Sequence, residues 1–196
     1  MEQPEAVRRA IEFLNRERLP YAVVGSVAAM VYGQPRMTND LDVLIDMRVE
    51  YIPLFLKEFP GPEWYVSDLG MRDAIQHRKM FNLLHMETGH KVDFMIPKAD
   101  WQVAQIERAI EGAIDKNLRG LVAHPQDIII GKLTYYAEGH SPKHLTDIQT
   151  MLAGSPELID RQQVASRAAE LGLLPIWEAI EQSEHQIPPL PPDFKV

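Results

Sequence analysis

The residues of this chain whose types and spacing could do chemistry are a Gly-Ser pair and three carboxylates. Gly25-Ser26 is followed, after thirteen residues, by Asp40-Leu41-Asp42, and a third carboxylate, Asp93, lies in the later run 91–96. A Gly-Ser pair ahead of a helix offers backbone N–H groups to a phosphate. Carboxylates that straddle one apolar residue offer oxygen ligands to a hard divalent cation. The combination predicts an enzyme that handles nucleoside triphosphates.

The three carboxylates are expected on one face of a sheet. Residues i and i+2 of a strand share a face, so Asp40 and Asp42 point together and the apolar residues beside them point away. In the run 91–96 the apolar residues alternate with Asp93 in the same way. If the two strands are neighbours, the carboxylates converge, and their repulsion calls for a cation such as Mg²⁺ or Mn²⁺. Asp40 and Asp42 would hold the metal, and Asp93 would bind it or take the nucleophile's proton.

The Gly-Ser pair is expected to hold phosphate. Gly25 lets the backbone approach a phosphate closely, and Ser26 can cap the following helix and offer its hydroxyl. The free N–H groups at the start of that helix attract anions. Arg36 and Thr38, just before the acids, could add donors to the same phosphates.

Each of these features has a bland interpretation when taken alone. An Asp-x-Asp triplet often solvates the end of a strand, and Gly-Ser before a helix is often only a capped helix start. A structural α/β domain whose acids solvate a sheet edge is therefore one alternative. The ordered combination of strand, Gly-Ser, short helix, acidic strand and a later strand with an inward acid favours a site.

The apolar pattern predicts an α/β half followed by a helical half. The first half contains predicted helices at 4–18, 27–32 and 50–59, strands at 21–24 and 41–45, and hairpins at 80–96 and 109–123. The second half contains predicted helices at 127–138, 142–152, 156–170 and 173–182, the third of them with Ser155 as its N-cap. We predict an α/β domain at 1–124, a helical region packed on it at 125–186, and a proline-rich tail at 187–196.

Together, Val24-Gly25-Ser26, Asp40, Asp42 and Asp93 resemble the pattern of the nucleotidyltransferase superfamily, which has the polymerase-beta-like fold. The phrase 33–42 looks most like the branch that contains the abortive-infection-type toxin nucleotidyltransferases and small uncharacterised relatives. The resemblance covers residues 20–152. It implies an α/β (α+β) fold with a mixed sheet, helices on one face and a C-terminal helical region.

The same resemblance implies roles for two residues of the helical half. By the family's later motif, Lys132 would touch the triphosphate, and Asp147 would orient it or contribute to the active site. The alternative interpretations are an exposed helix lysine for Lys132 and a capping or ion-paired carboxylate for Asp147.

The predicted reaction is Mg²⁺- or Mn²⁺-dependent transfer of a nucleoside monophosphate from a nucleoside triphosphate to an acceptor hydroxyl. The acceptor could be a protein, a tRNA or a small molecule such as an aminoglycoside. The toxin-like branch favours protein or RNA and makes an antitoxin partner one hypothesis. The alternative is a non-catalytic module of the same fold that binds a nucleotide or a partner protein.

Composition narrows the classes of partner. The net charge of −8 does not favour binding of nucleic acid through the overall charge of the protein. The absence of cysteine excludes disulfides and thiolate metal sites. No apolar run has the ~18 residues of a membrane helix, and the N-terminus has no signal-peptide pattern, so a cytoplasmic protein without a membrane partner is expected. A basic cluster at 72–79 is interpreted as a solvated loop, with guidance of a polyanionic acceptor as the alternative.

Overall fold

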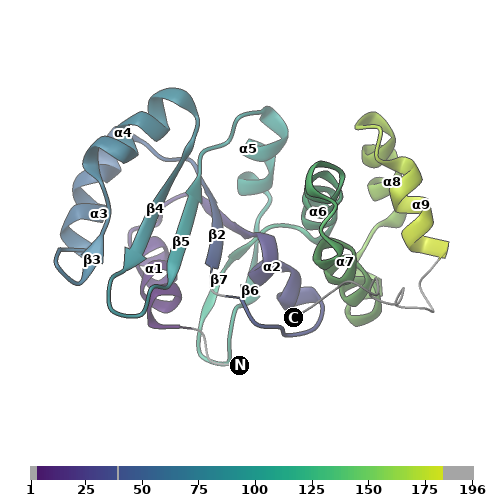
Figure 1. Ribbon diagram of the computed structural model, residues 1–196, viewed down its shortest axis with the longest axis horizontal. Helices are drawn as coiled ribbons and strands as arrows, with labels where there is room; N and C mark the ends of the chain where they lie inside the picture. Colours follow the sequence, from purple (N-terminus) through teal and green to yellow (C-terminus); the bar gives the residue numbers. More distant parts are fainter. Residues whose placement is uncertain (1–3, 39, 183–196) are drawn as a thin grey trace. The chain divides into compact units, whose positions relative to one another are not determined.

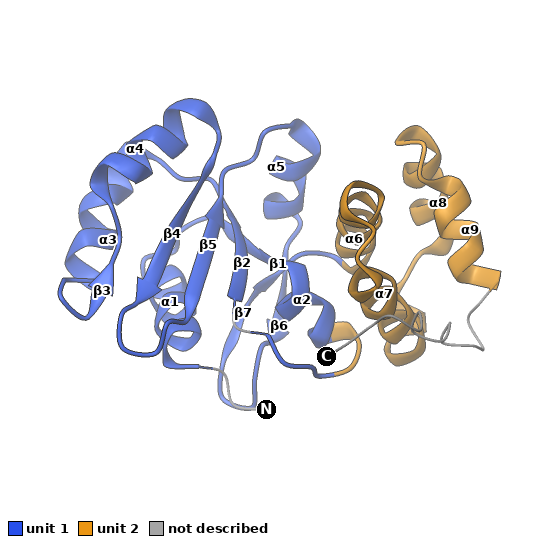
Figure 2. Ribbon diagram, viewed as in Figure 1, with its two compact units in different colours: residues 1–31, 35–124 blue, residues 32–34, 125–196 orange. Residues whose placement is uncertain are grey.

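Seven strands form one mixed sheet in the computed structural model, which describes residues 4–38 and 40–182 (Figure 1). The strands are β1 (Tyr21–Val24), β2 (Asp40–Ile45), β3 (Trp64–Tyr65), β4 (Met80–His85), β5 (Lys91–Met95), β6 (Ile110–Ala113) and β7 (Arg119–Val122). Their order across the sheet is β3-β4-β5-β2-β1-β7-β6. The chain divides into two units, residues 1–31 with 35–124 and residues 32–34 with 125–196 (Figure 2).

The centre of the sheet combines parallel and antiparallel pairs. β2 runs parallel to β5 and antiparallel to β1, and β1 runs parallel to β7. Two antiparallel hairpins, β4-β5 and β6-β7, complete the pattern, and β3 pairs with β4 at one edge. Both hairpins were expected from their alternating apolar residues. The parallel pairing of β2 with β5 brings the two acid-bearing strands side by side.

Five helices accompany the sheet: α1 (Glu5–Arg16), α2 (Gly25–Tyr32), α3 (Ile52–Glu58), α4 (Asp68–His77) and α5 (Asp100–Glu107). A short 3-10 turn, Val49–Tyr51, leads into α3. α1 lies against β5 and β7, α4 lies against β4, and α5 lies against β1 and β2. The aromatic core consists of rings in edge or stacked contact, namely Phe13, Phe55, Phe59, Phe81 and Phe94. This core occupies the sheet face opposite to Asp42 and Asp93.

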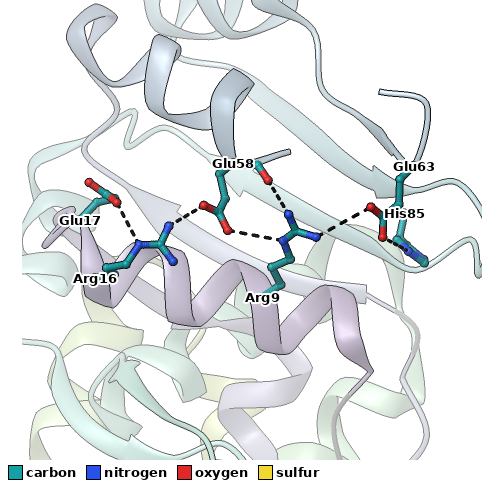
Figure 3. A network of polar contacts seen from close by, with 6 residues as sticks. All are labelled: Arg9, Arg16, Glu17, Glu58, Glu63 and His85. Atoms are coloured by element: carbon teal, nitrogen blue, oxygen red, sulfur yellow. Dashed lines mark hydrogen bonds and ion pairs between the residues drawn. The ribbon is translucent and has the colours of Figure 1, made fainter. Parts of the chain in front are cut away.

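A row of alternating positive and negative side chains connects α1 to α3 and to the strands β3 and β4 (Figure 3). Arg9 Nε lies 3.4 Å from Glu58 Oε1, and Arg9 Nη2 donates to the Glu58 backbone carbonyl at 2.8 Å. Arg16 reaches the other Glu58 oxygen at 2.5 Å, while Glu63 lies between Arg9 and His85. The Arg9 guanidinium also covers the Trp64 ring at 5.2 Å. These contacts hold α1 to α3 and to the β3-β4 edge of the sheet.

The second unit contains four α-helices within the part of the chain that the structure describes. They are α6 (Pro125–Gly139), α7 (Pro142–Gly154), α8 (Arg161–Glu170) and α9 (Leu174–Gln182), with a 3-10 turn at Pro156–Leu158. α6 packs against α7 and α8, and α8 packs against α9. Tyr32–Gln34 belongs to this unit, because the Ser155 hydroxyl donates to the Tyr32 carbonyl at 2.8 Å.

Two sequence predictions about elements need correction, and some elements were not predicted. The helix expected at 156–170 is broken after Leu158. The Ser155 hydroxyl donates to the Tyr32 carbonyl and does not cap a helix, and Asp160 caps α8 instead, by accepting from the Gln163 N–H at 2.9 Å. The basic cluster at 72–79 is only partly in a loop: Arg72 and His77 lie on α4, whereas Arg78 and Lys79 lie between α4 and β4. Its charges are also balanced, since Arg72 pairs with Asp68 at 2.8 Å and Lys79 with Asp73 at 3.2 Å. α5 was not predicted at all.

Two further predictions concern the proline-rich tail and membrane-spanning helices. The proline-rich tail at 187–196 lies outside the described residues. Among the helices that the structure describes, none combines the length and the apolar character needed to cross a membrane.

Candidate active site

The acidic face of the sheet is built by the register of β2 and β5. Asp42 is paired with Asp93, and Asp40 is paired with Lys91. Directly paired residues of parallel strands project from the same face, so the three carboxylates and the Lys91 ammonium share one patch. Asp40 is exposed, Asp42 is half-buried, and Asp93 is 8% exposed.

Gly25 lies directly against Asp42. β1 pairs with β2 so that Val24 faces Asp42, and the chain then turns into α2 without a loop. A Cβ on Gly25 would lie 2.0 Å from Oδ2 and 2.7 Å from Cγ of Asp42. Gly25 also has φ +65°, in the left-handed region that favours glycine. Two features therefore require glycine at this position: the left-handed backbone, and the Asp42 side chain, which leaves no space for a Cβ.

The polar residues before β2 reach the start of α2. Arg36 Nη2 donates to the Ser26 hydroxyl oxygen at 2.5 Å, although the two residues are ten positions apart. The Thr38 hydroxyl donates to the Asp40 carbonyl at 3.3 Å. Arg36 is thus held beside the first turn of α2, where free N–H groups and a cationic side chain together favour an anion.

Asp93 has two partners that sequence reasoning missed. Lys91 Nζ lies 2.8 Å from Asp93 Oδ2, and the Asn82 amide donates to Oδ1. Asn82 is paired with Asp93 across the β4-β5 hairpin. Lys91 precedes Asp93 by two positions, so strand alternation alone places both on one face. The sequence could have predicted that Lys91 lies beside Asp93. The position of Asn82 could not be predicted in the same way, because it depends on the register of the β4-β5 hairpin.

The carboxylates of the acidic face can be compared with the ligands that a divalent cation requires. Carboxylate oxygens are the ligands that Mg²⁺ and Mn²⁺ prefer, and Asp40 and Asp42 present them on one face. Within residues 4–38 and 40–182, however, no three His, Cys, Asp or Glu side chains stand in an arrangement that could hold a metal ion. Both oxygens of Asp93 are engaged, one by Lys91 and the other by Asn82. The donor chemistry of Asp40 and Asp42 fits such a cation, whereas Asp93 is in contact with the Lys91 ammonium.

Lys132 and Asp147 form a buried ion pair in the second unit. Lys132 Nζ lies 2.5 Å from Asp147 Oδ2, and their side chains are 3% and 6% exposed. Lys132 belongs to α6 and Asp147 to α7, so the pair joins the two helices. Of the alternatives from the sequence, the exposed helix lysine was wrong and the ion-paired Asp147 is what the structure shows.

Comparison with known proteins gives a likeness of fold. No protein-family model and no curated protein matches the chain. Among solved structures, the chain is similar to the antibiotic-resistance factor ANT(2'')-Ia, an aminoglycoside nucleotidyltransferase, in a solution structure described as showing substrate-regulated conformation dynamics. The TM-score is 0.53 at 13% identity, covering 92% of this chain and 95% of that chain.

The fold class expected from the sequence is thereby confirmed. A mixed seven-stranded sheet with helices and a C-terminal helical region matches a nucleotidyltransferase fold. At 13% identity the two chains share this fold, and neither activity nor substrate follows from it. The chemistry must be argued from the residues of the sheet's acidic face.

Proposed function

We propose that this chain is a Mg²⁺- or Mn²⁺-dependent nucleotidyltransferase. The acceptor oxygen forms a bond to the α-phosphorus of a nucleoside triphosphate, the bond to pyrophosphate breaks, and the hydroxyl gives up its proton. The observation that carries the proposal is the position of Asp42, which packs on Gly25 at the start of α2 and faces Asp93 in register. That arrangement brings together two carboxylates and the turn at Gly25, which we propose as the phosphate site.

The donor side of the reaction would use the start of α2. Gly25 lets a phosphate approach the backbone, and Ser26 contributes its hydroxyl and N–H. The Arg36 guanidinium, which already donates to Ser26, adds a cationic fork of the kind that binds phosphate oxygens. Thr38 adds a hydroxyl beside Asp40. By resemblance, Lys132 and Asp147 are further candidates for the triphosphate, and nothing in the fold comparison bears on them.

The acidic patch would serve the reacting groups. Asp40 and Asp42 would hold the divalent cation, which when bound supplies charge neutralisation to the triphosphate. Asp93 would assist the acceptor hydroxyl, as a further ligand or as the group that receives its proton. Asn82 orients the Asp93 carboxylate through its amide, so the second oxygen remains directed into the patch.

We consider three alternative acceptors: the hydroxyl group of a small molecule, of a tRNA or of a protein. The likeness to an aminoglycoside nucleotidyltransferase supports a small-molecule hydroxyl as the first to test. A toxin that modifies RNA or protein, with an antitoxin as partner, rests on the sequence resemblance alone.

A non-catalytic binding module is the second candidate. Its support is the engagement of both Asp93 oxygens by Lys91 and Asn82, which is what an acidic patch that does not use a cation would show. Such a module would bind a nucleoside triphosphate without forming a labelled product, so the two candidates differ in one measurable outcome.

The test is transfer of label from each α-³²P nucleoside triphosphate in the presence of Mg²⁺ or Mn²⁺. Separate reactions contain an aminoglycoside, total tRNA, or a cell lysate as protein source. Asp42→Asn is the site variant, and Asp46→Asn is its matched control, because Asp46 follows β2 and pairs with exposed Arg48 at 2.9 Å. Wild type and Asp46→Asn should label one acceptor class, and Asp42→Asn should lose at least about 100-fold in rate.

The outcomes separate the candidates. Label on an aminoglycoside, tRNA or protein identifies the acceptor class. Metal-dependent nucleotide binding that Asp42→Asn abolishes, with no label on any acceptor, favours the binding module. Label transfer that survives Asp42→Asn would contradict the proposed site.

A further inference from the structure

Lys91 places an ammonium group within the acidic patch. Its ammonium lies 2.8 Å from Asp93 Oδ2, with side chains 35% and 11% exposed respectively. Asn82 donates to the remaining Asp93 oxygen. A carboxylate so little exposed needs donors to offset its lost hydration, and these two residues supply them.

The ammonium also lies within the field of the other two acids. Lys91 is paired with Asp40 across β2 and β5, one strand step from the Asp42–Asp93 pair. The pKa of Lys91 is raised above its ordinary value, chiefly by the hydrogen bond to Asp93, with further contributions from the charges of Asp93, Asp40 and Asp42. The Lys91 ammonium is therefore in direct contact with Asp93 and lies in the field of the two carboxylates proposed to hold the cation.

We propose that Lys91 is the built-in counter-cation of this patch and that a divalent cation competes with it for Asp93. The inference rests on the proposed function, because it requires the cation site at Asp40 and Asp42. When the site is loaded, the divalent cation replaces the Lys91 ammonium as the positive charge beside Asp93. The Asn82 amide stays on Oδ1 and orients the carboxylate, while the Lys91 ammonium leaves Oδ2.

The geometry allows this exchange. Lys91 has a flexible four-carbon stem and is about a third exposed, so its ammonium can turn into water at small cost. Asp93 is fixed on the strand and nearly buried, so it cannot follow. An ordinary surface ion pair differs in this respect: Lys79 and Asp73 also form a pair, at 3.2 Å, but their side chains are 60% and 51% exposed.

The exchange has two measurable consequences. Without metal, removal of the Lys91 ammonium leaves the nearly buried Asp93 carboxylate without its ion-pair partner, so the thermal midpoint should fall by several degrees. With metal, removal of the competitor should tighten cation binding by at least about fivefold. The same substitution is therefore expected to destabilise the metal-free protein and to increase the shift in midpoint that the metal produces.

The experiment measures binding of Mn²⁺ alone to the full chain, by the electron paramagnetic resonance signal of free Mn²⁺, together with thermal unfolding in EDTA and in Mn²⁺. The variants are Lys91→Met and Lys91→Arg. Lys79→Met is the matched control, and Asp42→Asn marks the site. Lys91→Met should bind Mn²⁺ more tightly than wild type and gain the larger midpoint shift. Lys91→Arg, which keeps the charge, and Lys79→Met should stay within twofold of wild type.

The outcomes distinguish this inference from the proposed function. If Asp42→Asn leaves Mn²⁺ binding unchanged, or if neither wild type nor Lys91→Met binds Mn²⁺, the cation site itself is wrong and both proposals fall. If Asp42→Asn abolishes binding while Lys91→Met binds as wild type or more weakly, only the competition is overturned. If Lys91→Met is unfolded in EDTA and folds on addition of Mn²⁺, the exchange is supported.

Discussion

Gly25 and Asp42 fit against each other with no space for another atom. The Oδ2 atom of Asp42 occupies a place only 2.0 Å from where a Cβ on Gly25 would stand. Because Gly25 begins α2 and Asp42 lies on β2, this contact sets the position of a carboxylate relative to a helix N-terminus. It is the contact on which the proposed joining of phosphate and cation depends.

Gly25→Ala should therefore abolish metal-dependent nucleotide binding. The Cβ must displace the Asp42 carboxylate, and the left-handed backbone adds a strain of about 1–3 kcal/mol. Gly89→Ala is the matched control, since Gly89 has φ +71° and nothing within 4 Å of its would-be Cβ. It should show the strain in thermal unfolding but retain binding, measured by calorimetry with ATP, CTP, GTP and UTP. Equal binding by the two variants would contradict the role of the Gly25–Asp42 contact.

Arg36→Gln should weaken nucleotide binding at least about tenfold, because a charge-assisted hydrogen bond to phosphate contributes about 1.5–3 kcal/mol. Its contact with Ser26 is part-buried but close to the surface, so the thermal midpoint should change little. Arg48→Gln is the control: Arg48 is exposed and paired with Asp46 beyond the other end of β2. Calorimetric titration of the three proteins tests this. Equal affinity of Arg36→Gln and Arg48→Gln would exclude Arg36 from the phosphate site.

Lys132→Met should lower the free energy of unfolding by about 3–5 kcal/mol, since it removes one member of a buried ion pair and leaves the Asp147 charge in place. The double variant Lys132→Met/Asp147→Leu should recover much of this loss, because an apolar pair replaces the charges. Lys143→Met, on the exposed side of α7, should be neutral. Thermal unfolding measures all three.

The same double variant tests the triphosphate role that resemblance assigns to Lys132. A folded double variant with weakened nucleotide binding would support that role. A folded double variant with wild-type binding would leave the pair a purely structural link between α6 and α7.

Tyr21 should make the first unit sensitive to alkali. Burial raises the pKa of its hydroxyl to about 12, from an ordinary value of 10. Between pH 10 and 12 the unfolded chain loses this proton while the folded chain keeps it, so the free energy of unfolding falls with pH, by at most about 1.4 kcal/mol per unit. Below pH 10 the stabilisation is complete.

Tyr21→Phe should flatten that fall. The variant has no hydroxyl to ionise, but it also loses the bond to Asn15 at 2.7 Å and the bond from the Leu121 N–H at 3.0 Å. At pH 8 it should be about 1–3 kcal/mol less stable than wild type. Denaturant unfolding at pH 8 and pH 11 measures both effects. Parallel pH dependence in the two proteins would show that another group dominates.

Strands with strong alternation were predictable, and helices with weak periodicity were not. β2, β4 and β5 lie within a residue or two of their predicted bounds because apolar and polar residues alternate along them, and β1 was predicted as a short, fully apolar run. α4 was missed because it buries only Met71 and Ala74, which leaves little apolar periodicity. The helix predicted at 156–170 was wrong because the partner of Ser155 is Tyr32, far away in the sequence.

Along the chain, local alternation by itself determined that Asp40 and Asp42 share one face of a strand and that Asp93 opposes the apolar face of another. Only the tertiary structure decided what each acid meets. Gly25 lies against Asp42, Lys91 and Asn82 hold Asp93, and Lys132 pairs with Asp147. The physical reason is that the face of a side chain follows from the backbone's two-residue period, whereas its partner follows from strand register and helix packing, which depend on the whole core.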